Sequence, residues 1–365
     1  MRICCMIASL RMGGAERQLA GLAVLLKQAG HDVEVLTYRD GDFYAGELAD
    51  AGVSRAQIQQ KGGDLSLIRA TAYHLRAKHT ELLISFLAGT NVKACLVKRQ
   101  YPELQLIVSE RNCNTSFLPH DRLRFFLYKL YAQKVVSNSY AQTEFIRAHA
   151  PALQGRLYTI PNFADLERFS PGPSREAQSD GLFRIACTAR LAPRKNALGL
   201  IKAAALCPGI RIDWYGAAAK DAYFTRCTKA ILTLGLERRF FIHEGSSAPE
   251  SVYREADAFC LPSFYEGTSN SLAEALASGL PAACSKVSDN PRYVQEGRNG
   301  YLFNPSDVNS IAFALRRLAS MKPEALLKAG QASRAIALSS FSQENFLSRY
   351  EELICGPAEG KKGNS

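Results

Sequence analysis

The segment Phe259–Pro281 constrains the fold of this chain more than any other. An apolar run ends at Pro262, a turn of small residues follows, and a helix-forming run then ends at Gly279. This order predicts a buried strand, a tight loop and a helix. The loop is rich in Gly, Ser, Thr and Asn and leads into a helix N-terminus, whose free N–H groups and positive dipole end suit a phosphate.

Two carboxylates flank this junction. Glu266 precedes the helix, and Glu274 lies eight positions later, a spacing that does not place two side chains on one helix face. Both can face one ligand only if Glu266 is a loop residue and Glu274 lies in the first two turns. The pair would then suit a sugar nucleotide, which has an anionic middle and hydroxyls at both ends. Two alternatives are open. Ser271 and Glu274 form the S-x-x-E pattern of a capping box, so Glu274 would only cap the helix, and Glu266 would be a solvated turn residue.

The length of 365 residues favours two domains. With 47% hydrophobic and 22% charged residues, the composition is that of a soluble globular protein with large cores. No apolar run reaches the ~18 to 20 residues that a membrane span needs. The apolar run over residues 1–8 is too short for a signal peptide, so we interpret it as a first buried strand.

Cysteine usage and charge narrow the functional classes. The ten cysteines show no CxxC or other metal-ligand spacing, which favours reduced thiols in a cytosolic protein. The net charge is +11, and the excess leans to the first half, with 20 basic against 13 acidic residues up to Phe163. Such an excess suits an anionic membrane, a phosphorylated substrate or nucleic acid. No nucleic-acid-binding motif accompanies it, so nucleic acid ranks last.

The first half alternates apolar runs with helical patterns, which predicts a parallel α/β sheet. The strand over residues 2–8 is followed by a Gly13-Gly14 turn, a helix over 15–29 and a strand over 31–37. The turn lies at the carboxyl end of the first strand, where such sheets bind ligands. A turn of this kind is more often structural, and it is not the G-x-G-x-x-G pattern of nicotinamide dinucleotide sites.

Two later segments of the first half carry polar or basic side chains. A strand over residues 104–108 leads into Glu110 and Arg111, for which a cleft and a surface loop are both open. Residues 120–134 form a basic, aromatic helix. This helix either lies on a membrane surface or packs on the core with a solvated basic edge, and we favour the second interpretation slightly.

The second half restarts the pattern after a segment near 165–181 that is rich in proline and glycine. A strand over 183–188 precedes Arg190 and Lys195, a cation pair that can neutralise a diphosphate, although isolated cations of this kind are usually surface residues. A strand over 210–216 ends at Gly216. The chain therefore contains two similar α/β halves, and ligands commonly bind between such halves.

Taken in order, these motifs resemble retaining glycosyltransferases of the GT-B fold, specifically glycosyltransferase family 4 (glycosyl transferases group 1). The resemblance covers nearly the whole chain and rests on the segments Met12–Arg17, Ile160–Phe169, Arg190–Lys195, Pro262–Glu274 and Gly297–Leu302. Each motif is weak alone, and together they are specific.

We therefore predict an α/β, GT-B fold of two tandem Rossmann-like, doubly wound domains with an interdomain cleft. The N-terminal, acceptor-side domain spans residues 1–165, and residues 166–181 form a linker. The nucleotide-sugar-binding domain spans residues 182–345. Residues 346–365 form the end of a C-terminal helix and a disordered tail.

The resemblance implies a role for each site residue. Arg190 and Lys195 would bind the diphosphate and stabilise the leaving nucleotide, and Glu266 would contact hydroxyls of the donor sugar; these three are the predicted catalytic residues. Glu274 would hold the ribose hydroxyls. The other predicted donor-binding residues are Gly13, Gly14, Gly216, Gly267, Thr268, Ser269 and Asn270. The two cations replace a metal ion, so neither a metal nor a cofactor is expected.

One segment departs from the family pattern. Many relatives place a His near the donor sugar where this chain has Ser109–Asn112, so we predict that Glu110 or Arg111 lines the acceptor side of the cleft.

The expected reaction transfers a hexose or N-acetylhexosamine from a nucleotide-diphosphate sugar, such as a UDP-sugar, to a growing glycan. The basic first half suggests a lipid-linked acceptor of cell-surface polysaccharide, lipopolysaccharide or glycan biosynthesis. It also suggests a cytoplasmic protein, peripheral on the inner face of the membrane and in contact with anionic lipid. A catalytically silent sugar-nucleotide or glycan-binding protein is the alternative, and a sugar-nucleotide epimerase is a more distant one.

Overall fold

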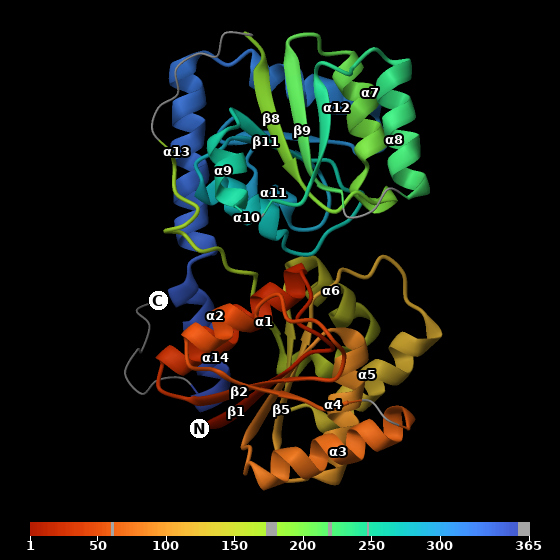
Figure 1. Cartoon of the computed structure of the whole chain (residues 1–365), viewed down its shortest axis with the longest axis vertical. Coiled ribbons are helices and arrows are strands. Elements are labelled where there is room, and N and C mark those ends of the chain that lie inside the picture. Colours follow the sequence, from red (N-terminus) through yellow and green to blue (C-terminus); the bar gives the residue numbers. More distant parts are fainter. Residues whose placement is uncertain (60–61, 173–180, 218–220, 247, 357–365) are drawn as a thin grey trace. The chain divides into compact units, whose positions relative to one another are not determined.

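The computed structural model describes residues 1–59, 62–172, 181–217, 221–246 and 248–356. It divides into two compact units: unit 1 joins Met1–Pro161 with the segment from Glu344 onward, and unit 2 is Asn162–Gln343. Each unit is built on one sheet with helices on both faces (Figure 1). The predicted α/β class with two doubly wound domains is therefore confirmed.

Unit 1 contains a seven-stranded parallel sheet in the order β3-β2-β1-β4-β5-β6-β7. Its strands are β1 (Arg2–Met6), β2 (Asp32–Thr37), β3 (Ser54–Gln57), β4 (Leu82–Phe86), β5 (Gln105–Glu110), β6 (Lys134–Ser137) and β7 (Leu157–Thr159). Its helices are α1 (Gly14–Gln28), α2 (Ala45–Asp50), α3 (Gly63–Ala77), α4 (Ala88–Gln100), α5 (Pro119–Tyr131), α6 (Tyr140–His149), η1 (Pro151–Arg156) and α14 (Gln343–Cys355).

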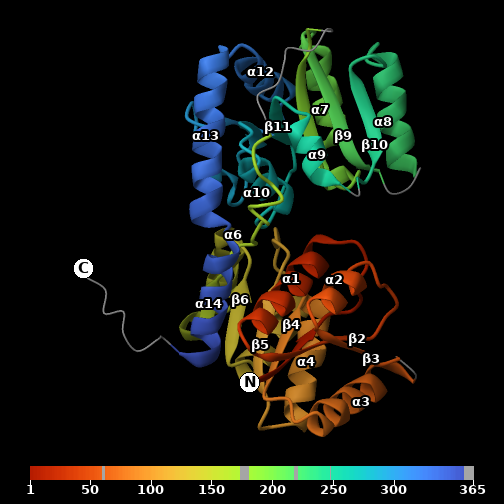
Figure 2. The ribbon, with the colours of Figure 1, turned by 60° about the vertical axis from the view of Figure 1, so that its left-hand side comes forward.

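The core of unit 1 follows from strand alternation, because successive side chains of a strand point to opposite faces of the sheet. Cys4, Leu83 and Val108 share one hydrophobic cluster with side chains of α3, α4 and α5. Helix α14 returns from the C-terminal part of the chain to this unit, where Phe346 and Tyr350 are buried. Figure 2 shows α14, in blue, beside the strands of unit 1.

Unit 2 contains a six-stranded parallel sheet in the order β10-β9-β8-β11-β12-β13. Its strands are β8 (Phe183–Thr188), β9 (Ile210–Ala217), β10 (Phe240–Glu244), β11 (Ala258–Leu261), β12 (Ala282–Ser285) and β13 (Gly300–Phe303). Its helices are η2 (Pro193–Lys195), α7 (Ala197–Ala205), α8 (Ala222–Thr233), α9 (Pro249–Arg254), α10 (Asn270–Ala277), α11 (Asn290–Tyr293), α12 (Val308–Ala319) and α13 (Pro323–Ser340).

The two faces of the unit 2 sheet have separate cores. Ile212 and Trp214 pack with α7, α8 and α12, while Phe259 and Leu261 pack with α9, α10 and α13. Chain order reverses between β8 and β11, which are hydrogen-bonded neighbours. Ligands of such sheets bind at the carboxyl ends of the strands beside this switch point. A ligand site is therefore expected at the loops that follow β8 and β11.

The border between the units differs from the predicted one at residue 165. Unit 2 already begins at Asn162, because Phe163 and Phe169 are buried in unit 2. The Arg334 guanidinium also donates hydrogen bonds of 2.9 Å to the main-chain oxygens of Leu166 and Phe169. The first part of the predicted linker is thus packed on unit 2, while residues 173–180 lie outside the described residues.

The C-terminal border differs as well. The predicted end of the second domain at residue 345 falls inside α14, and that helix belongs to unit 1 from Glu344 onward. Arg349 donates a hydrogen bond of 3.3 Å to the main-chain oxygen of Thr159, at the end of β7. The part of the predicted tail over residues 357–365 lies outside the described residues.

Two further observations concern the cysteines and the helices. All ten cysteines are free, and burial raises the pKa of the Cys5 and Cys95 thiols to about 12, which keeps both thiols protonated. Among the described residues, no helix combines the length and the apolar character that crossing a membrane requires.

Candidate functional site

The loops after β8 and β11 meet in unit 2. The β8 loop carries Arg190 and Lys195, and Glu266 lies in the β11 loop just before α10. The main chains of the two loops are joined, because the Phe264 N–H donates to the Arg194 oxygen at 2.9 Å. Residues from separate parts of the sequence are therefore held together at one edge of the sheet.

A buried ion pair lies at the centre of this junction. Lys195 Nζ donates to Glu266 Oε1, and Ser263 Oγ donates to the same oxygen at 2.6 Å. The Glu266 N–H lies 3.4 Å from Ser288 Oγ in the loop after β12. Only 9% of Lys195 and 7% of Glu266 are exposed. The interpretation of Glu266 as a solvated turn residue is therefore wrong, and burial strengthens the electrostatic interactions of both groups.

The N-terminus of α10 is fixed by side chains on both sides. Ser269 is the N-cap, and its Oγ accepts from the Leu272 N–H. Asn162 Nδ2 donates to the Thr268 oxygen at 2.8 Å and to Asn270 Oδ1 at 2.6 Å. The predicted donor-binding segment Gly267–Asn270 therefore lies at the positive end of the helix dipole, as the sequence pattern predicts.

Glu274 lies in the second turn of α10 and is 4% exposed. The Tyr253 hydroxyl of α9 lies 2.8 Å from Glu274 Oε2 and 2.7 Å from Thr188 Oγ1 at the end of β8. The capping-box alternative is wrong, because the helix begins after Ser269 and not after Ser271. Tyr253 instead holds the Glu274 carboxylate.

Gly216 supports the loop that carries Arg190. Its φ is +127°, and a Cβ at this position would lie 2.4 Å from the main-chain oxygen of Ala189. The Leu191 N–H donates to the Gly216 oxygen at 3.1 Å. The two main chains approach so closely that only glycine fits here. Arg190 itself is exposed.

Two family models match the chain. Residues 12–168 match Glycosyltransferase Family 4, and residues 174–335 match Glycosyl transferases group 1. The chain is a family 4 glycosyltransferase. The predicted family is thereby confirmed.

The fold of this chain is similar to that of a solved structure. HepE from Anabaena, solved in complex with UDP-glucose, is 21% identical and has a TM-score of 0.86, with 98% of this chain and 100% of that chain covered. At this level of identity the likeness establishes the GT-B fold alone.

Curated relatives match over shorter regions. The D-inositol 3-phosphate glycosyltransferase of Mycolicibacterium smegmatis is 27% identical over 209 residues, 54% of this chain and 48% of that protein. The UDP-Gal:alpha-D-GlcNAc-diphosphoundecaprenol alpha-1,3-galactosyltransferase of Escherichia coli is 26% identical over 182 residues, 46% of each chain. The chain thus spans about half the length of these two relatives.

The predicted glycines of unit 1 lie at the start of α1. Gly13 is its N-cap with an extended backbone, and Gly14 is its first residue. The Tyr44 hydroxyl donates to the Gly13 oxygen at 3.1 Å. Both glycines follow β1, at the carboxyl edge of the unit 1 sheet, and their contact with a donor stays a prediction.

Glu110 and Arg111 lie inside unit 1. Strand β5 runs through Glu110, so this residue belongs to the strand and not to a loop after it. Glu110 accepts from the Tyr128 hydroxyl, and its Oε1 lies 3.5 Å from Arg124 Nε. The Arg111 guanidinium lies 4.0 Å above the Phe86 ring, and its burial lowers its pKa from the usual value. These contacts fix both side chains in the interior of unit 1, and an acceptor role stays a prediction.

The side chains that hold the two carboxylates are not predicted from the sequence. Ser263 lies three residues before Glu266 in the segment Pro262–Glu274, and this short spacing could have indicated that the two side chains are in contact. Tyr253 and Thr188 belong to other elements and carry no local pattern that connects them with Glu274. Asn162 belongs to the segment Ile160–Phe169 that carries the family resemblance, but no role for its side chain is predicted from the sequence.

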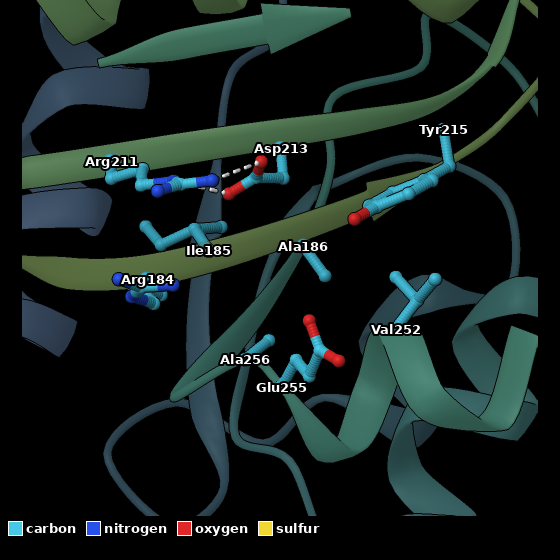
Figure 3. Close-up of a pocket in the computed structure, with 9 residues that line it drawn as sticks. All are labelled: Arg184, Ile185, Ala186, Arg211, Asp213, Tyr215, Val252, Glu255 and Ala256. Atoms are coloured by element: carbon cyan, nitrogen blue, oxygen red, sulfur yellow. Dashed lines mark hydrogen bonds and ion pairs between the residues drawn. The ribbon is translucent and has the colours of Figure 1, made fainter. Parts of the chain in front are cut away.

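Two cavities lie away from these residues. One, of about 30 Å³, lies in unit 2 between β8, β9 and α9, and Figure 3 shows Arg211 paired with Asp213 on its wall. The other, of about 530 Å³, lies in unit 1 between the β6–β7 edge and α14. The residues that line these two cavities include none of the predicted site residues of the described chain. Neither cavity therefore marks the candidate site.

Proposed function

We propose that this chain is a retaining glycosyltransferase that moves a hexose or N-acetylhexosamine from a nucleoside-diphosphate sugar to a growing, lipid-linked glycan. The observation that carries the proposal is the buried Lys195–Glu266 pair beside the N-terminus of α10. A cation, an acid and oriented N–H groups lie close together there, and a diphosphate joined to a sugar would need these groups. Family membership agrees with this arrangement.

The leaving group sets the main task of the site. As the bond between the anomeric carbon and the diphosphate oxygen breaks, its electron pair passes to that oxygen. Arg190, Lys195 and the N–H groups at the start of α10 stabilise the developing charge, because they are positioned before the reaction begins. The acceptor hydroxyl forms the new bond on the same face of the sugar, and its proton passes to the departing phosphate.

The two acids act as binding groups in this proposal. In the described part of the chain, Lys195 and Ser263 both donate to Glu266 Oε1, which leaves Oε2 to accept from the donor sugar. Glu274 holds the ribose hydroxyls from the second turn of α10, in the position that Tyr253 sets. The β11 loop and α10 thus supply contacts to opposite ends of the donor.

Two observations support a UDP-type donor and a lipid-linked acceptor. The HepE structure contains UDP-glucose, and the Escherichia coli relative is named for a UDP-galactose donor and a diphosphoundecaprenol-linked acceptor. The basic excess of the first half favours an anionic surface as well. We assign the chain on these grounds to cell-surface polysaccharide or lipopolysaccharide biosynthesis, at the inner face of the cytoplasmic membrane.

Thermal-shift measurements with UDP- and GDP-sugars test the donor proposal. A saturating UDP-sugar raises Tm because it binds only the folded chain. At a hundredfold excess over Kd, the free energy of unfolding rises by about 2.7 kcal/mol. Glu274→Gln removes most of this shift, whereas Glu324→Gln, at an exposed position of α13, keeps it. No shift with any nucleotide sugar, or an equal shift in Glu274→Gln, contradicts the proposal.

Turnover assays then separate the classes of protein. A shift without any consumption of donor indicates the silent binding protein, and conversion of the donor sugar without an acceptor indicates an epimerase.

Tyr253→Phe tests how Glu274 is positioned. The change deletes the hydroxyl that joins Glu274 to Thr188, at a cost of about 1–3 kcal/mol in the bound state. We expect Kd for UDP, measured by calorimetry, to rise about tenfold while kcat at saturation stays within about twofold. Tyr293→Phe, another buried tyrosine of unit 2, leaves Kd unchanged. An unchanged Kd in Tyr253→Phe shows that the hydroxyl serves folding alone.

A further inference from the structure

Helix α5 carries large apolar side chains on its solvent side. Leu123 is 61% exposed, Phe126 is 55% exposed and Leu130 is 52% exposed. These positions are three and seven residues apart, so they form a stripe along one face of the helix. The opposite face buries Phe125 and Tyr128 in the core of unit 1. The helix is therefore packed on the core and also presents a second apolar face outward.

The loop before α5 extends this surface. Phe117 is 38% exposed and Leu118 is 45% exposed. The Phe117 ring stacks on His149 of α6 with 4.8 Å between ring centroids, so the loop side chain is held in place. We call Phe117, Leu118, Leu123, Phe126 and Leu130 the α5 patch. Because α5 follows β5, the patch begins near the carboxyl edge of the unit 1 sheet.

The exposed charges of the segment that carries the patch are all positive. Arg122 and Lys129 are exposed on one flank of the stripe. Asp121 is the single acidic residue between positions 117 and 134, and it is buried and paired with Arg124 at 2.7 Å. The solvent side of α5 thus combines apolar side chains with cations whose long stems can lie along an apolar surface while their charges reach outward.

We propose that the α5 patch binds the surface of an anionic lipid bilayer. Leu123, Phe126 and Leu130 enter the boundary between headgroups and acyl chains, and Arg122 and Lys129 contact lipid phosphates. A bilayer fits better than a second copy of this chain, because two copies packed face to face would bring like charges together. The inference rests on the proposed function, because it names the face that meets the membrane of the acceptor. Vesicle binding requires no catalysis and can therefore be measured independently of that function.

Vesicle flotation of the full chain tests this inference without any substrate. At low salt we expect binding to phosphatidylcholine vesicles with about 30% phosphatidylglycerol, little binding to pure phosphatidylcholine, and release by salt. The variant Leu123→Ser/Phe126→Ser/Leu130→Ser lowers the partition coefficient more than tenfold. The matched control, Phe313→Ser/Leu327→Ser/Leu338→Ser, changes side chains of 55%, 65% and 49% exposure in unit 2 and keeps the binding.

A second pair of changes separates the charges from the apolar contacts. Arg122→Gln/Lys129→Gln lowers binding about thirtyfold, at about 1 kcal/mol per cation, and weakens its dependence on anionic lipid and on salt. Equal binding of the α5 patch variant and the parent overturns the inference, as does binding that ignores anionic lipid. A parent dimer that the α5 patch variant turns into a monomer also overturns it. The UDP shift, measured on the same variants, reports separately on the proposed function.

Discussion

Replacing Lys195 with methionine lowers kcat by about 10²- to 10³-fold, the usual loss when one group that stabilises a leaving oxyanion is removed. The change also leaves Glu266 buried without its cation, which costs about 3 kcal/mol of folding stability. Steady-state kinetics with a UDP-sugar and denaturant unfolding of the same sample measure the two effects.

The double variant Lys195→Met/Glu266→Gln separates these effects. Neutralising Glu266 removes the unpaired buried charge, so stability returns to within about 1 kcal/mol of the parent. The rate does not return and stays well below that of Glu266→Gln alone, because the cation that the leaving diphosphate needs is still missing. If activity and stability return together, Lys195 acts only as a structural partner of Glu266 and the proposed role in leaving-group stabilisation is wrong.

Gly216→Ala is expected to lower unfolding stability by about 2–4 kcal/mol, because the new Cβ would lie 2.4 Å from the Ala189 oxygen at a φ of +127°. The clash is with main chain and not with a flexible side chain, so the β8 loop has to move. Since that loop carries Arg190 and Lys195, we also expect kcat/KM to fall by about tenfold or more.

Gly209→Ala is the matched control for this change. Gly209 directly precedes β9, and a Cβ there would meet no heavy atom within 4 Å. This variant should unfold within about 0.5 kcal/mol of the parent, as is usual for surface changes, and keep full activity. A Gly216→Ala protein as stable and active as Gly209→Ala would show that the β8 loop adapts without cost.

Much of the fold was predictable because its strands are buried runs bounded by turn signals. The α10 junction illustrates this, since Pro262 and Gly279 bracket a loop and helix that the structure confirms. Strand β3 was missed for the opposite reason. It lies at the edge of the sheet, its side chains are mostly exposed, and it therefore lacks an apolar pattern.

Individual site residues were predictable, but the contacts between them were not. The family resemblance implied that Lys195 and Glu266 face one ligand, but not that they contact each other across 71 positions of sequence. That pairing depends on the strand order, which brings the β8 and β11 loops together. The link from Tyr253 to Glu274 depends in the same way on how α9 packs beside α10, and no local pattern encodes it.

The return of α14 to unit 1 has a consequence for biosynthesis. A ribosome releases Met1–Pro161 long before it reaches Phe346 and Tyr350, the residues that α14 buries in that unit. Part of the apolar surface of unit 1 therefore stays uncovered until Phe346 and Tyr350 have emerged, whereas the segment that forms unit 2 is continuous in the sequence. Chaperone contact during translation should accordingly concentrate on the half that is made first.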